Sequence, residues 1–105
     1  MKQQIAVSIG LALAASATLA LGSSSVDVGI KEFKFAPAAL EVRPGTRVTW
    51  TNHDEETHTI TSTTGAFGSR GLGNDETFAQ TFTRPGTYEY FCALHPRMRA
   101  TVIVK

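Results

Sequence analysis

At 105 residues the chain is one domain at most, and ten basic and nine acidic side chains give it a formal net charge of +1. This balance provides no basic excess for binding nucleic acid and no acidic tract of the kind that keeps a chain disordered. Six Phe, two Tyr and one Trp are a good apolar supply for the core of so small a domain.

The N-terminal stretch has the pattern of a secretory signal peptide. Lys2 is followed by an apolar run rich in Ala and Leu at residues 5–21, and small residues follow at 22–25. A charged start, an apolar stretch and small residues at its exit are typical of such a signal. We therefore expect residues 1–22 to be a cleaved signal peptide and residues 23–105 to be a single domain.

Two alternatives to this cleavage stay open. The bond after Ala17 is a second candidate beside the one after Gly22, and the apolar run approaches the length of an uncleaved membrane anchor. Export places the domain in an oxidising compartment, which we expect to be the periplasm. Cys92 is the one cysteine and forms no disulfide within the chain, so it is an oxidation liability unless a metal holds it.

From Ser23 onward the chain consists of short alternating apolar and polar segments separated by turns, without a helical period. Pro-Gly pairs at residues 44–45 and 85–86 suit type II turns. Residues 63–75 hold four glycines and are expected to form a long loop, and no Gly-Lys-Ser/Thr ending follows that would indicate phosphate binding. The pattern predicts an all-β fold, an antiparallel β-sandwich of seven to eight strands, with strands near residues 26–30, 33–35, 40–42, 47–51, 57–61, 78–83, 88–92 and 100–104.

Alternation also assigns faces to the strands. Tyr88, Tyr90 and Cys92 share one side, and if Cys92 faces the interior both tyrosines point inward and their hydroxyls need hydrogen-bonding partners. His58 and Ile60 point inward from another strand. His58 and Cys92 can therefore converge at the same end of the sandwich.

The densest group of chemically active residues is the motif Cys92-x-x-His95-x-x-Met98. Taken singly, a lone cysteine or methionine is more often part of the core. A thiolate, an imidazole and a thioether at steps of three, completed by a second imidazole from His58, match the His₂Cys set with a weak axial Met of copper electron-transfer sites. His53 is the competing second histidine, but it lies in a polar turn where a solvated role is favoured.

Two segments carry a wider pattern. Residues 48–52 read Val-Thr-Trp-Thr-Asn, with His58 six residues after the Asn, and residues 85–92 read Pro-Gly-Thr-Tyr-Glu-Tyr-Phe-Cys, followed by the short ligand loop. Together they resemble the cupredoxin family, and within it the amicyanins, over residues 26–105. The resemblance implies a Greek-key β-sandwich of eight strands and one copper ion that cycles between Cu(I) and Cu(II), with ligand roles for His58, Cys92, His95 and Met98.

The resemblance also implies supporting roles. It assigns Asn52 to tying the two ligand-bearing loops together and to hydrogen bonding around the cysteine sulfur. Leu94 and Arg97 stand where amicyanins tend to have Pro and Phe. The glycine-rich stretch lacks the Met-rich patch of the family, which leaves Phe67 and Leu72 as apolar substitutes.

These features predict a periplasmic blue-copper protein that carries single electrons between transient redox partners, a dehydrogenase, a c-type cytochrome or both. We expect the His95 ring edge to be the electron exit, within an apolar collar that includes Leu94 and Pro96. The protein is expected to be a monomer without a small-molecule or nucleic-acid partner, and to contact a membrane only if the leader is retained. Scattered cations are candidates for a basic rim that selects an acidic partner, namely Arg70, Arg84, Arg97 and Arg99.

Other functions stay open beside this one. A copper-delivery protein would carry the metal as cargo, although a thiolate site backed by aromatic residues is closed to easy release. An enzyme is disfavoured, because an oxidase needs an open metal position that four protein donors do not leave, and a hydrolase needs a free histidine beside Cys92. A secreted sandwich with incidental ligand types would bind no copper.

Overall fold

The structure, a computed structural model, describes residues 24–105, so the expected signal peptide at residues 1–22 lies outside the described part of the chain. Two four-stranded sheets have the strand orders β2-β1-β4-β6 and β3-β8-β7-β5. Across residues 24–105 no helix is long and apolar enough to cross a membrane. The strands are β1 (Ser25–Lys31), β2 (Lys34–Ala36), β3 (Ala39–Val42), β4 (Thr46–Asn52), β5 (Thr61–Ser62), β6 (Thr77–Phe82), β7 (Gly86–Cys92) and β8 (His95–Val104).

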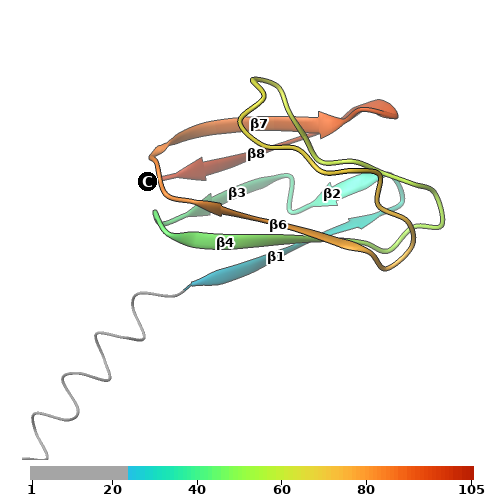
Figure 1. The fold of residues 1–105 in the computed structure, drawn as a ribbon, viewed down its shortest axis with the longest axis horizontal. Coiled ribbons are helices and arrows are strands. Elements are labelled where there is room, and N and C mark those ends of the chain that lie inside the picture. The colour runs from blue at the N-terminus through green and yellow to red at the C-terminus, as the bar shows by residue number, and fades with distance from the viewer. Residues whose placement is uncertain (1–23) are drawn as a thin grey trace, which may run out of the picture.

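The predicted all-β sandwich is confirmed, and the direction of pairing differs from expectation in two places. β1 pairs with β4 and β3 pairs with β8 in parallel, while the other four pairs are antiparallel. The chain crosses to the second sheet between β2 and β3 and returns at β4, so β4 enters beside β1 in the same direction. Figure 1 shows β7 and β8 above the layer that contains β1, β4 and β6.

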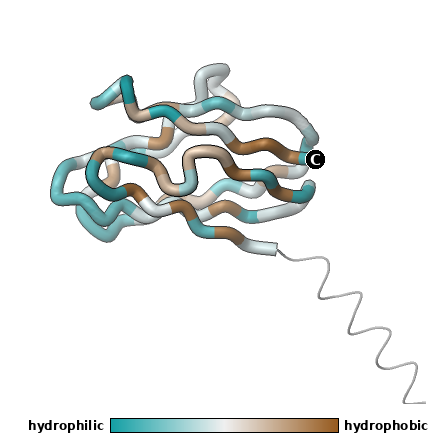
Figure 2. Tube along the Cα trace, turned by 180° about the vertical axis from the view of Figure 1, so that it is seen from behind, coloured by the Kyte–Doolittle hydropathy of each residue, from teal (hydrophilic) through white to brown (hydrophobic). Residues whose placement is uncertain are grey.

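The core lies between the sheets and centres on Trp50 of β4 and Tyr90 of β7, neither more than 1% exposed. Figure 2 shows apolar and polar residues alternating along the strands, as a half-buried sheet requires. The predicted inward position of Tyr90 is confirmed, and its hydroxyl accepts a hydrogen bond from Trp50 Nε1 at 3.0 Å. Tyr88 is partly buried and its hydroxyl donates to the carbonyl of Arg84 at 2.6 Å, so both tyrosines have the partners that burial demands.

The prediction of a strand at residues 57–61 is wrong for most of this segment. Regular pairing is limited to the two residues of β5, which pair with β7. The glycine-rich loop of residues 63–75 folds back over the segment and supplies the backbone partners that a full strand would otherwise provide. Two isolated bridges make this connection, His58 with Leu72 and Thr61 with Gly68.

Candidate metal centre

An irregular hairpin between β7 and β8 brings Cys92 and His95 together. Pairing runs regularly as far as Phe91, which lies opposite Arg99, and then shifts so that Cys92 lies opposite His95. Without the shift, the ladder would place Cys92 opposite Met98. Strand β8 therefore begins at His95 rather than near residue 100 as expected, and the shift is what sets an imidazole beside the thiol.

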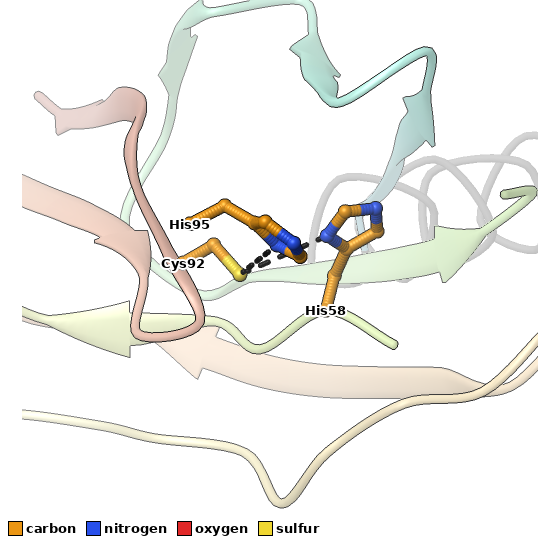
Figure 3. Close-up of side chains that lie close together, drawn as sticks. All are labelled: His58, Cys92 and His95. Carbon is orange, nitrogen blue, oxygen red and sulfur yellow. Dashed lines mark hydrogen bonds between the residues drawn. The ribbon is translucent and has the colours of Figure 1, made fainter. Parts of the chain in front are cut away.

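His58 reaches the same point from the segment between β4 and β5. It is fully buried, and its Nδ1 lies 3.7 Å from Cys92 Sγ, while His95 Nδ1 lies 3.6 Å from the same sulfur. Figure 3 shows the three side chains pointing toward one another, and their donor atoms all lie within 4.8 Å. This end of the sandwich is opposite the C-terminus (Figure 1).

These distances fit a bound metal. A metal about 2.3 Å from a sulfur and about 2.0 Å from an imidazole nitrogen, with an angle of about 110–120° between them, separates the two donors by about 3.5–3.7 Å. Met98, the fourth predicted donor, is buried at 6% exposure on β8, in the core cluster that includes Cys92. Two imidazoles, a thiolate and a thioether form a donor set that suits copper.

Thr59, which follows His58 directly, connects the two segments that carry the candidate ligands. Its backbone N–H donates to Cys92 Sγ at 3.3 Å. Its Oγ1 accepts a hydrogen bond from the N–H of Ala93 at 2.8 Å. One residue therefore holds both the sulfur and the turn after it, and sequence analysis did not identify it.

The role expected for Asn52 is wrong in its details. Its side-chain Nδ2 donates to the carbonyls of Glu56 and Leu72, both at 2.8 Å, and its Oδ1 accepts from the N–H of Asp54 at 2.9 Å. Asn52 thus joins the segment before His58 to the glycine-rich loop. The contacts to the Cys92 sulfur and to the hairpin turn come instead from Thr59, the residue after His58. Its backbone N–H lies close to the site because it directly follows a candidate ligand.

Asp54 is a second supporting residue that sequence analysis missed. Its Oδ2 lies 2.9 Å from His58 Nε2. Burial raises the pKa of the Asp54 carboxyl, but hydrogen bonds from the N–H groups of Phe33 and Glu32, and from His58, outweigh this effect and hold its pKa below the ordinary value. An ionised carboxylate only accepts, so His58 Nε2 donates and the Nδ1 lone pair faces Cys92.

The rim around His95 is apolar. His95 itself is partly exposed, and Leu94 beside it is 56% exposed. Phe33, from the turn between β1 and β2, is 41% exposed and lies edge-on to the His95 ring with 4.8 Å between centroids. Leu94 and Phe33 are the exposed large apolar side chains of residues 24–105, so the expected collar includes Phe33, which lies far from His95 in sequence.

Several other residues singled out in the sequence lie away from this centre. His53 is half exposed, with its Nδ1 3.9 Å from Asp75 Oδ1, and it does not join the group formed by the other two histidines. Phe67 and Leu72, the expected apolar substitutes for a Met-rich patch, are 8% and 1% exposed and belong to the core. The glycine-rich loop turns these side chains inward, so they do not form an exposed patch.

The arginines expected to form one rim are divided among separate places. Arg97 and Arg99 line a shallow hollow together with Lys34, beside Met98. Arg70 donates to Glu76 Oε1 at 3.1 Å, and Arg84 lines a different hollow. Of the four arginines, Arg97 and Arg99 therefore share a hollow with Met98, and Lys34 lines the same hollow.

Comparison with known proteins adds an independent finding. A family model described as a cupredoxin-like domain matches residues 4–104. Amicyanin from Paracoccus denitrificans is 33% identical over 96 residues, which cover 87% of this chain and 72% of that protein. A solved copper(I) form of an amicyanin variant has a TM-score of 0.74 at 29% identity, and the match covers 77% of this chain and 82% of the other.

One similar structure is an enzyme. A copper-containing nitrite reductase from Thermus scotoductus SA-01 has a TM-score of 0.73 at 30% identity, over 77% of this chain. The match covers 22% of the enzyme chain. The likeness is therefore to one part of a much longer protein.

Proposed function

The chain belongs to the cupredoxin family, and on that premise we propose that it is a periplasmic blue-copper protein that carries one electron at a time between redox partners. The proposed ligands are His58, Cys92, His95 and Met98. The observation that carries the proposal is the convergence of one sulfur and two imidazole nitrogens, at 3.6 and 3.7 Å, in a buried site. The copper ion, when bound, supplies reversible one-electron chemistry at this point.

The surrounding residues suit electron transfer because they hold the donors in one arrangement. Thr59 N–H donates to the Cys92 sulfur at 3.3 Å, and such a hydrogen bond lowers the electron donation of the sulfur to a metal. Asp54 fixes the ring of His58. Cys92 and His58 are fully buried, so water does not enter between them when the charge of the site changes. A site that is already arranged needs little reorganisation on gaining or losing an electron.

His95 is the proposed exit for the electron. It is the one partly exposed member of the three converging residues, whereas the other two are buried, and Leu94 and Phe33 form an apolar surface around it. Small apolar surfaces of this kind suit brief contacts between redox proteins. We propose a dehydrogenase, a c-type cytochrome or both as partners, and the cations Lys34, Arg97 and Arg99 beside this surface favour an acidic one.

We propose no enzymatic function. Four protein donors leave no open position for a substrate. The nitrite reductase match concerns a fraction of that enzyme, and within residues 24–105 the converging group of metal-binding side chains is the one described above. Turnover of nitrite by the copper-loaded protein would contradict this part of the proposal.

The visible absorption spectrum of the purified domain after addition of Cu(II) tests the proposal. We expect an intense blue band in the wild type, no such band in Cys92→Ser, and a shifted band in Met98→Ala. His53→Ala is the control and should leave the band unchanged. A colourless wild type would refute the copper site. Transfer of copper to an acceptor protein without redox cycling would instead favour delivery of the metal as cargo.

A further inference from the structure

We infer that Asp54 is a positioning residue that couples the turn between β1 and β2 to the ring of His58, and so holds Phe33 against both candidate histidine ligands. The geometric part of this inference concerns the protein without metal. Its consequence for metal retention rests on the proposed function.

The carboxylate of Asp54 has three donors from two separate parts of the chain. Its Oδ1 accepts the N–H of Glu32 at 2.7 Å, and its Oδ2 accepts the N–H of Phe33 at 2.9 Å. The same Oδ2 accepts His58 Nε2–H at 2.9 Å. The Asp54 side chain is only 11% exposed, so water replaces these acceptors poorly when the carboxylate is removed.

The turn that Asp54 contacts is unfavourable by itself. Glu32 and Phe33 have φ values of 55° and 60°, and they connect Lys31 and Lys34, which pair across the hairpin. Two left-handed residues in a two-residue hairpin turn are the pattern that Asn and Gly usually supply, and side chains with a Cβ resist it. The two N–H groups that donate to Asp54 therefore compensate for a strained turn.

This turn places the ring of Phe33 on the candidate metal centre. The ring lies edge-on to His58, with centroids 5.0 Å apart and planes at 87°, and edge-on to His95 at 4.8 Å and 89°. Phe33 is nevertheless 41% exposed, so the core alone does not hold it. Its position depends on the turn, and the turn depends on Asp54.

Two consequences follow for the site. Loss of the carboxylate removes the acceptor that keeps the proton of His58 on Nε2, so the Nδ1 lone pair no longer faces Cys92 in every molecule. It also frees Phe33 to leave both rings, which opens the partly exposed side of His95 to solvent. Supporting residues of this kind typically change metal affinity by about 10–100-fold.

NMR of the metal-free protein tests the geometry directly. In the wild type we expect contacts between the Phe33 ring protons and both imidazoles, and a His58 ring that carries its proton on Nε2. Asp54→Ala should lose the contacts and mix the two tautomers. Asp54→Asn keeps the shape but has one acceptor oxygen for three donors, so its losses should be intermediate. Glu55→Ala, which removes an exposed carboxylate from the same loop, should match the wild type.

A second variant distinguishes the effect of Asp54 on the turn between β1 and β2 from its effect on the His58 ring. Glu32→Gly relieves the left-handed strain, so adding it to Asp54→Ala should restore the Phe33 contacts while the His58 tautomers stay mixed. A fully folded Asp54→Ala or Asp54→Asn protein with unchanged contacts and one tautomer would overturn the inference. With Cu(I) and a competing chelator, Asp54→Ala should bind about 10–100-fold more weakly than Glu55→Ala. Unaltered affinity would overturn the metal-retention consequence, whereas a wild type without a blue band refutes the proposed function alone.

Discussion

Replacing Thr59 by Val is the sharpest test of how the two ligand-bearing segments are held together. Thr59 Oγ1 accepts the N–H of Ala93 at 2.8 Å and lies 2.8 Å from Thr61 Oγ1. Valine keeps the branched shape and replaces the hydroxyl by a methyl group, so packing is preserved. The backbone N–H that donates to Cys92 is also preserved.

The expected cost follows from the partners that lose a hydrogen bond. The N–H of Ala93 loses its acceptor in a partly buried position, and a net hydrogen bond contributes about 0.5–1.5 kcal/mol. The hydroxyl of Thr61 is partly exposed, and water replaces its partner. We therefore expect Thr59→Val to lower the free energy of unfolding by about 1 kcal/mol, which corresponds to a fall in Tm of about 4–8 °C for a domain of this size.

Urea unfolding of the metal-free protein measures this difference, with Thr61→Val as the matched control. Thr61→Val removes only the hydroxyl pair with Thr59 and should change stability by less than about 0.5 kcal/mol. In the copper-loaded protein, Thr59→Val should shift the visible band without abolishing it, because Cys92 remains. Equal stability of the two variants would show that the Oγ1 contact to Ala93 does not hold the hairpin turn.

Three other outcomes are expected. Burial raises the pKa of Tyr90 to about 12 from 10.0, so the folded state holds this proton more tightly than the unfolded state does. The free energy of unfolding should therefore fall by about 2–3 kcal/mol between pH 10 and 12. Tyr90→Phe should remove this dependence on pH, and Tyr88→Phe should retain it. Free copper at about 100 times its Kd should raise the free energy of unfolding by about 2.7 kcal/mol, and Cys92→Ser should lose most of this gain. Copper titrations should show strong loss of affinity in His58→Ala and none in His53→Ala, and the reverse order would refute the choice of histidine.

Local pattern was sufficient to predict the sandwich and the convergence of His58, Cys92 and His95. Alternation over a few residues correctly placed Trp50 and Tyr90 in the core, because side chains on a strand alternate between its faces. The motif from Cys92 to Met98 is contiguous, so its chemistry is visible without a fold. His58 was separable from His53 because an apolar neighbour at the second position after it indicated an inward face, while His53 lay among polar residues.

Contacts between distant segments were beyond the reach of the same patterns. The loop that replaces the strand expected at residues 57–61 is defined by bridges to residues 68 and 72, and no periodicity indicates them. The pairing shift after Phe91 depends on which residue of β8 meets Cys92. The resemblance alone assigned Asn52 to hydrogen bonding around the Cys92 sulfur, whereas the observed donor is Thr59. The contact is made by a backbone N–H, so it depends on the position of the residue beside His58 and not on the type of its side chain.

The supports of the candidate centre come from three places, and each holds a different donor. Thr59 holds the sulfur of Cys92, Asp54 holds the ring of His58, and the pairing shift in the hairpin holds His95. Each of these contacts joins parts of the protein itself, so the fold alone holds the candidate donors close together. The folding free energy of the sandwich therefore maintains this grouping, and a metal that binds only the folded chain adds its binding free energy to the stability of the fold.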